Sequence, residues 1–358
     1  MHRQLRFQLA ALLLFGPAAH AITIYVTYGS DVPTAAQTIF NQVVANYDAE
    51  FTNVTLTGAN TGSTGQVNLT VDWGATGLGQ SQTNYVYVSY STWRNAMLSD
   101  STANPGNTDL ASGYASLPSS NPLGSNTCDP STYAGCVELT SANARALGIT
   151  QSQVAFGCIN PSVSCSTLQP DSTLTFTNQA NVFDFAGGLF NFQNVAEHEL
   201  DEALAVNSTL TGLAVGAALP TDYASEDYFR YTPAGGVCNG VVQASTARCF
   251  STGGSDTVYF SPDGGVTDVA QFFQGANADR NDWIYGSTSC SFPPGPYVQD
   301  AYSCATTVAP NITPGGAATP ELAVLNTLGF NSSAPEPGTM ALIAAGIGAL
   351  LIRRKRAI

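Results

Sequence analysis

Four carboxylates crowd around one histidine in residues 194–206, NVAEHELDEALAV. On a helix, His198 and Glu202 lie four positions apart, so both side chains can reach one point in space and offer two ligands to one metal ion. Glu199 lies one step round the helix, where it can act as a general base toward water that the metal activates. The spacing therefore predicts metal-assisted hydrolysis.

The H-E-x-x-H helix of zinc proteases has this geometry, with two histidines as ligands and the intervening glutamate activating water. In this chain, Glu202 takes the place of the second histidine. Zinc accepts carboxylate oxygen beside histidine nitrogen, although a further carboxylate makes the site harder and less selective for zinc. A lone His-Glu pair is weak evidence by itself. The alternative interpretation is a solvated helix face that carries one histidine.

The amino-terminal segment limits the supply of other ligands. Residues 1–21 have a basic start, an apolar run and an A-x-A cleavage site, and we interpret them as a signal peptide for Sec-type export. His2 and His20 lie in that segment, so the mature chain, from Ile22, would keep only His198. The remaining metal ligands must therefore be carboxylates or backbone oxygens.

The histidine helix must be positioned by the rest of an α+β domain. We expect Val195, Leu200, Ala203, Leu204 and Val206 to face the core, and His198 with its four neighbouring carboxylates to cover the rest of the helix surface. Periodicity predicts strands at 22–27, 67–73, 84–91, 174–176, 182–185, 227–231, 257–260 and 269–273, and helices at 33–51, 91–98, 141–147 and 319–328. We assign Asp31 and Thr319 as helix N-caps, Gly329 as a C-cap and 101–122 as a loop.

All eight cysteines follow the predicted signal peptide, and they fall as sequential neighbours. This spacing predicts four local disulfides that staple loops in an oxidising compartment. The predicted pairs are Cys128 with Cys136, Cys158 with Cys165, Cys238 with Cys249, and Cys290 with Cys304. The absence of a C-x-x-C pair argues against a thiolate zinc site.

The chain is strongly acidic, with a formal net charge of −14. Six of its eleven basic residues lie in the two terminal segments, which leaves five arginines and no lysine between them. A body with so few cations will not bind nucleic acid or an anionic surface by electrostatic attraction. The composition suits a soluble exported protein that binds divalent cations.

The carboxyl end carries a three-part pattern in residues 333–358. Pro335, Glu336 and Pro337 precede an apolar run at 340–352, predicted to be a transmembrane helix, and a basic tail at 353–356 closes it. This pattern resembles the PEP-CTERM sorting signal of Gram-negative bacteria. The resemblance implies processing by an exosortase in the inner membrane, followed by release to the cell surface or to an extracellular matrix. It also implies contact with the membrane only through this tail.

The region between the signals, 22–332, resembles a family of bacterial secreted proteins inferred to be metalloproteases, which commonly carry PEP-CTERM tails. The matching stretches, in order, are 87–91, 94–95, 197–202, 227–231, 259–265, 282–283, 299–301 and 321–330. In that family the helix reads H-E-[I/L]-x-E. The resemblance implies a zincin-like domain with long disulfide-stapled loops and a bound Zn²⁺ or another divalent cation. It implies that His198 and Glu202 are ligands and that Glu199 is the catalytic base.

Neither the resemblance nor the helix names a third ligand. We favour Asp227, because it heads a strand-like stretch about one element beyond the helix. Asp222, Glu226, Asp282 and Asp300 are alternatives.

Two functional hypotheses follow. The first is an exported metallopeptidase that hydrolyses peptide or protein substrates. The second is a non-catalytic surface or matrix protein on a zincin scaffold, in which His198 and its acids hold a structural cation or none. The scarcity of histidine and the sorting tail favour the second hypothesis, whereas the helix spacing and the family resemblance favour the first.

Overall fold

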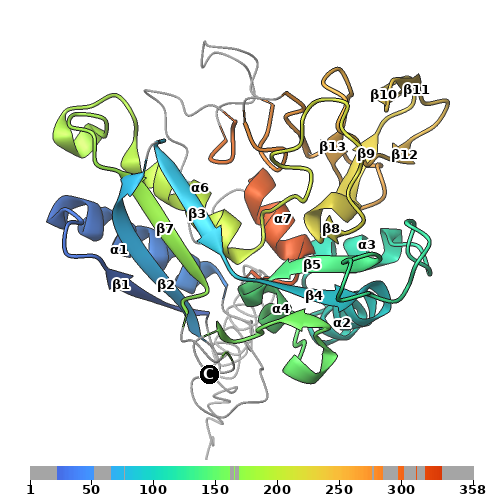
Figure 1. Ribbon diagram of the computed structural model, residues 1–358, viewed down its shortest axis with the longest axis horizontal. Helices are drawn as coiled ribbons and strands as arrows, with labels where there is room; N and C mark the ends of the chain where they lie inside the picture. Colours follow the sequence, from blue (N-terminus) through green and yellow to red (C-terminus); the bar gives the residue numbers. More distant parts are fainter. Residues whose placement is uncertain are drawn as a thin grey trace, which may run out of the picture.

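A computed structural model describes residues 22–51, 66–75, 77–161, 165, 169–275, 278–284, 297–301, 312 and 319–332. The predicted signal peptide and the predicted tail lie outside the described residues. The described residues form a mixed α+β fold (Figure 1).

The first sheet has the strand order β1-β2-β7-β3. Its strands are β1 (Thr23–Tyr28), β2 (Gln66–Ala75), β7 (Ser172–Thr177) and β3 (Gly79–Thr83). The first three run parallel, and β3 pairs antiparallel with β7 at the sheet edge. In β2, Val67, Leu69 and Val71 alternate into the core, as the period of a strand requires.

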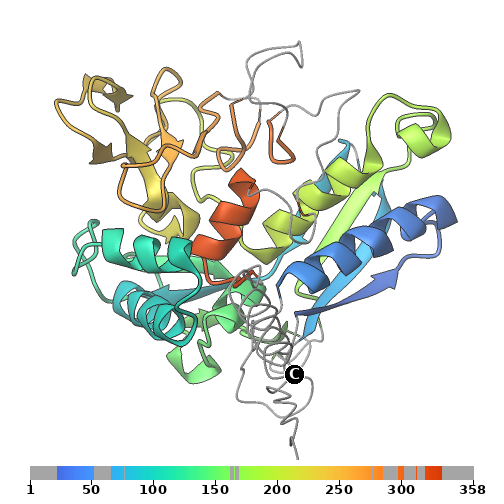
Figure 2. The same ribbon diagram turned by 180° about the vertical axis from the view of Figure 1, so that it is seen from behind.

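Two helices pack together beside this sheet, α1 (Thr34–Glu50) and α6 (Phe192–Leu204) (Figure 2). In α1, Ala36, Phe40, Val43 and Tyr47 are fully buried at helical spacing. The predicted cap Asp31 is wrong: Pro33 occupies the N-cap position, and no side chain caps the helix. Two residues lie between Asp31 and Thr34, the first residue of the helix, so Asp31 does not occupy the N-cap position.

The second sheet has the order β6-β4-β5-β8. Its strands are β6 (Phe156–Gly157), β4 (Tyr85–Ser89), β5 (Cys136–Thr140) and β8 (Tyr223–Ala224). Beside it lie α2 (Tyr90–Ala103), α3 (Thr108–Ser116), α4 (Ser141–Ala146) and the short 3₁₀ helix η1 (Gln151–Gln153). Only Asn84 separates β3 from β4, so the chain passes from the edge of one sheet directly into the other.

The last part of the chain is mostly irregular. It contains a sheet of order β12-β9-β13-β14 and a hairpin of β10 and β11 (Figure 1). The bounds are η3 (Glu226–Phe229), β9 (Arg230–Thr232), β10 (Val237–Cys238), β11 (Val241–Val242), β12 (Ala247–Arg248), β13 (Tyr259–Phe260), β14 (Ala270–Gln271) and α7 (Pro320–Thr327). The short 3₁₀ helix η2 (Asp184–Ala186) lies earlier, between β7 and α6. Thr319 caps α7 as predicted, accepting from the Leu322 N–H, and Gly329 follows the C-cap residue Leu328 in the left-handed region.

Three predicted elements are wrong. The stretch 101–122 is not a loop, because α2 extends to Ala103 and α3 follows, capped by Asn107. Its small residues allow close packing: a Cβ on Gly113 would lie 2.8 Å from Thr327 and 3.3 Å from Phe229. Residues 182–185 form a single bridge and η2, and 226–229 form η3, because local turn bonds replace the expected strand pairing.

Three of the four predicted disulfides are confirmed: Cys128–Cys136, Cys158–Cys165 and Cys238–Cys249. Each closes a loop of 7 to 11 residues. Cys290 and Cys304, the fourth predicted pair, both lie outside the described residues. The pairing of Cys290 with Cys304 therefore stays a prediction.

A membrane-spanning helix is absent from the described part of the chain. Among the described helices, none combines the length and the apolar character that a membrane crossing requires. The run at 340–352, which the sequence predicts to span the membrane, lies outside the described residues.

A buried ion pair joins the first sheet to α4. The Arg145 guanidinium lies 2.8 Å from the Asp171 carboxylate, and it also donates to the carbonyls of Ile159 and Gln66. Asp171 accepts from the backbone N–H of Asn68 as well. Both charged groups are almost completely buried, so each depends on the other for its charge compensation.

We predict that Arg145→Met lowers the free energy of unfolding by about 3–5 kcal/mol, because it leaves the Asp171 charge buried without a cation. Urea unfolding followed by tryptophan fluorescence measures the effect. Arg94→Met is the control, since Arg94 is only partly buried and stacks on the ring of Tyr114. Equal unfolding midpoints for the two variants would contradict the prediction.

Candidate metal centre

Helix α6 positions the histidine and its neighbouring acids. Asn191 caps the helix by accepting from the Asn194 N–H at 3.0 Å. The expected exposed acidic surface is wrong, because Glu197, Glu199 and Asp201 are buried. The sheet edge and α1 cover this side of α6: the Tyr47 hydroxyl of α1 donates to Asp201 at 2.7 Å. The acids of this helix therefore lie inside the protein.

Three side chains converge at one point. One ligand atom from each of His198, Glu202 and Asp282 lies within 4.8 Å of the other two. His198 Nε2 is 3.7 Å from Glu202 Oε1 and 3.6 Å from Asp282 Oδ1. On the other side of the ring, Nδ1 lies 3.0 Å from the Val298 carbonyl oxygen. Because a carbonyl can only accept, this bond places a proton on Nδ1 and directs Nε2 toward the two carboxylates.

Neighbouring segments fix the orientation of Glu202. Ser81 of β3 donates to its Oε2 at 2.7 Å, and the Asn281 amide donates to its Oε1 at 3.1 Å. Glu199 lies against the same edge strand. A Cβ on Gly79 would come within 2.8 Å of the Glu199 carboxyl carbon, so only glycine leaves room for this side chain.

These groups open into a cavity of about 290 Å³. It is lined by Gly79, Gln80, Ser81, Tyr85, His198, Glu199, Glu202, Val206, Asn207, Ser208, Thr211, Asp279 and Asn281. The lining is mostly polar and contains no arginine or lysine.

The charged groups of this site shift one another's pKa values. Burial by itself would lower the pKa of His198, but Asp282, Glu202 and Glu199 raise that pKa to about 10. Burial raises the pKa of Glu199 well above its usual value, and the Glu202 charge raises it further. The pKa of Asp282 is likewise raised by burial, against the opposing effect of His198. Burial and mutual repulsion thus disfavour the charged forms of Glu199 and Asp282, and the imidazole opposes this effect.

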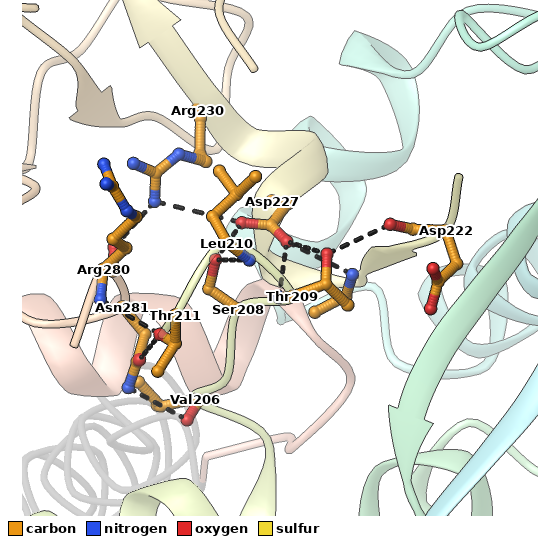
Figure 3. Close-up of polar contacts among 11 residues, drawn as sticks. Val206, Ser208, Thr209, Leu210, Thr211, Asp222, Asp227, Arg230, Arg280 and Asn281 are labelled. Carbon is orange, nitrogen blue, oxygen red and sulfur yellow. Dashed lines mark hydrogen bonds and ion pairs between the residues drawn. The ribbon is translucent and has the colours of Figure 1, made fainter. Parts of the chain in front are cut away.

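Asp227 lies in a different network, which Figure 3 shows. Its carboxylate accepts from the Ser208 hydroxyl at 2.6 Å and from the backbone N–H groups of Thr209 and Ala224. Arg230 lies 3.9 Å from it. Asp227 is therefore satisfied by donors, and it anchors the loop that follows α6 instead of joining His198.

The network of Asp227 nevertheless reaches the centre. Arg230 donates to the Arg280 carbonyl at 2.8 Å, and the Arg280 N–H donates to Thr211 Oγ1 at 3.0 Å (Figure 3). Thr211 Oγ1 then donates to Asn281, the residue whose amide holds Glu202. Of the acids considered as a third ligand, the structure groups Asp282 with His198 and Glu202, while Asp222, Glu226, Asp227 and Asp300 are outside this group.

Several of these residues carry little signal in the amino-acid sequence. Gly79 and Ser81 belong to β3, GQSQT, which has no apolar residue to mark it as a strand. Asp282 was one of five candidate acids, and Asn281 and Val298 were not considered. The alternation of glutamine with small residues in β3 was the one local signal available.

A divalent cation fits this group of side chains. Bond lengths of 2.0–2.2 Å in a tetrahedral site place neighbouring ligand atoms about 3.4 Å apart. The observed 3.6 and 3.7 Å are close to that value and too long for hydrogen bonds. Asp282 Oδ1 and Glu199 Oε2 are also buried without a hydrogen-bond donor among the described residues. The donor set of one nitrogen and two carboxylates suits zinc and similar ions.

Comparison with known families matches residues 333–356 to the PEP-CTERM protein-sorting motif. No curated protein and no solved structure matches the chain. The motif supports a secreted protein that an exosortase processes and sorts to the cell surface or matrix.

Glu138 of β5 supports the wall of the cavity. Its carboxylate accepts from the Tyr87 hydroxyl at 2.6 Å and from the amide of Asn207, which lines the cavity, at 3.1 Å. Burial raises the pKa of Glu138 to about 7, and the charges of Asp222 and Asp227 add to the effect. Protonation of Glu138 therefore favours the folded protein.

We predict that Glu138 makes the protein less stable as the pH rises from about 4.5 to 7. The pKa of Glu138 is higher in the folded than in the unfolded protein. The stabilisation is therefore complete below the unfolded pKa, and it is lost as the pH rises through the folded pKa. Glu138→Gln removes this contribution, which is on the order of 1–3 kcal/mol. Urea unfolding at pH 5 and pH 8 gives the difference for each protein. Identical pH differences for wild type and variant would refute it.

Proposed function

We propose that this protein is an exported, metal-dependent peptidase with its centre at His198, Glu202 and Asp282. The observation that carries the proposal is the convergence of one ligand atom from each of these three side chains within 4.8 Å. His198 and Glu202 also line one polar cavity together with Glu199. Asp282 replaces Asp227 as the proposed third ligand. A metal ion held there would polarise a substrate carbonyl and lower the pKa of a water molecule.

Glu199 is the proposed general base. Its carboxyl group lines the cavity one residue from His198, and Oε2 has no donor among the described residues. An acceptor oxygen that is free of hydrogen bonds can take a proton from water and pass it to the leaving amine. Gly79 of the edge strand leaves the space that this carboxyl group occupies.

Strand β3 supports a peptide as the substrate. It forms the edge of the first sheet in the described residues, and its Gly79, Gln80 and Ser81 line the cavity. An edge strand exposes unpaired backbone N–H and C=O groups, to which an extended peptide can add as a further strand. A peptide bound in this way would pass beside His198 and Glu199.

The order of elements also supports a zincin-like domain. A strand, a helix, further strands, the helix with the metal ligands, irregular loops and a closing helix follow one another along the chain. The sorting motif supports exosortase processing and sorting to the cell surface or matrix. In the proposed function, the protein would be anchored transiently in the inner membrane and would hydrolyse peptides or proteins after its release.

The decisive measurement is the metal content and peptidase activity of the secreted protein, purified without chelators. We expect about one zinc or similar ion per chain, lost in His198→Ala, since that variant removes the only nitrogen ligand. Glu199→Gln should keep the metal but lose activity by about 10²–10⁴-fold, the usual contribution of a general base. A wild-type protein without metal, whose melting temperature is unaffected by chelators, would favour the non-catalytic matrix protein instead.

A matched pair of variants tests the third ligand. Asp282→Asn should weaken zinc binding, because a neutral amide is a poor ligand for this ion. Asp227→Asn should leave the zinc affinity close to that of the wild type, since its carboxylate binds Ser208, Thr209 and Ala224 instead. Competition with a chromophoric chelator measures both affinities. The assignment is wrong if only Asp227→Asn loses zinc.

A further inference from the structure

One buried peptide group connects the closing helix to the histidine. The Val298 carbonyl lies 3.0 Å from His198 Nδ1, and the N–H of Gln299 donates to Glu321 Oε1 at 3.0 Å. These two groups belong to the same peptide unit. Since C=O and N–H point in opposite directions in a trans peptide plane, the unit bridges the Glu321 carboxyl group and the imidazole ring.

The same oxygen of Glu321 has a second donor. Trp283 Nε1 donates to Oε1 at 3.0 Å, and Trp283, Gln299 and Glu321 are each at most 1% exposed. The backbones also pair: the Trp283 N–H donates to the Gln299 carbonyl at 2.8 Å, and the Ala301 N–H donates to the Trp283 carbonyl. Glu321 thus fixes both the segment that faces His198 and the residue that follows Asp282.

We propose that Glu321 is a positioning residue for His198, acting through the Val298–Gln299 peptide. By holding this peptide, it presents the carbonyl that fixes the proton on Nδ1 and leaves Nε2 directed at Glu202 and Asp282. This inference rests on the proposed function of the centre. Metal-binding histidines commonly donate their second N–H to a carboxylate or carbonyl, which sets the tautomer and the ring orientation.

The geometry favours an effect on the ring beyond simple packing. An acceptor on the N–H side of an amide polarises the group and strengthens the carbonyl as an acceptor on its other side. Loss of the Glu321 oxygen would also leave the Gln299 N–H buried without a partner. The peptide would then turn to find another acceptor, and the Val298 carbonyl would move away from Nδ1.

Zinc affinity of the full secreted protein tests the proposal through three variants. Glu321→Leu has a similar size but no acceptor, and we expect it to weaken zinc binding by about 10–100-fold. Glu321→Gln keeps an acceptor oxygen and should bind zinc nearly as the wild type does. Trp283→Phe is the matched control, because it removes only the indole donor and leaves the Gln299 bond intact.

The imidazole proton gives a second readout, which does not require metal or activity. His198 is the only histidine after residue 20, so its ring resonances in a ¹⁵N-labelled sample that starts at Ile22 need no assignment. We expect a protected Nδ1–H signal in the wild type, Glu321→Gln and Trp283→Phe, and its loss in Glu321→Leu. If Glu321→Leu does not fold, Glu321→Asp takes its place. Its side chain is one methylene shorter, which moves the carboxylate oxygen away from the Gln299 N–H.

The two readouts separate the possible failures. A folded Glu321→Leu or Glu321→Asp protein with wild-type zinc affinity and an unchanged Nδ1–H signal overturns the role of Glu321. A wild-type protein that binds no zinc, but loses the Nδ1–H signal in the Glu321 variant, supports the positioning role and overturns the proposed metal centre.

Discussion

Burial of carboxylates is the constraint on which this structure depends. A buried carboxylate requires a cation or several hydrogen-bond donors, and between the terminal segments this chain has only five arginines and no lysine. Asp171 meets the requirement with the Arg145 guanidinium and with donors from Asn68 and Ser141. Asp227 and Asp256 meet it chiefly with backbone N–H groups and hydroxyls. Other buried acids lack donors: Glu199, Asp282 and Asp300 each keep one buried oxygen, and Glu226 keeps both, without a hydrogen-bond donor among the described residues. A cation at the proposed centre would compensate two of these four acids, Glu199 and Asp282.

The centre is assembled from segments far apart in the sequence. Helix α6 supplies His198, and β3 contributes the small residues that allow α6 to approach the sheet edge. The segments 278–284 and 297–301 then cover the opposite side and bring Asp282 and the Val298 carbonyl to the ring. Helix α7 ties these two segments together through Glu321. Hydrogen bonds around the centre therefore hold these irregular segments in place.

The sequence predicted α6 because a histidine and two glutamates at helical spacing are a local pattern. It also predicted most strands with apolar alternation, and the three local disulfides, since sequential cysteines reveal short loops. Strand β3 was missed because GQSQT lies at an edge and buries little apolar surface, so its pairing is set by β7. Asp282 could not be chosen among five acids, since the route of the chain after α6 decides which one meets His198. The burial of Glu197 and Asp201 was missed for the same reason: helical periodicity does not show what packs on the polar side.

The donor set also bears on which cation the proposed centre would hold. Calcium and magnesium prefer six or more oxygen ligands, and an imidazole nitrogen contributes poorly to such a shell. One histidine with two carboxylates suits zinc and similar transition metals, and the two negative charges match a dication. The Val298 carbonyl would add to this selectivity, because it orients a ring nitrogen, and hard cations bind ring nitrogens weakly. In the proposed centre, Glu202 in place of a second histidine would add a negative charge, and His198 would favour zinc over calcium and magnesium.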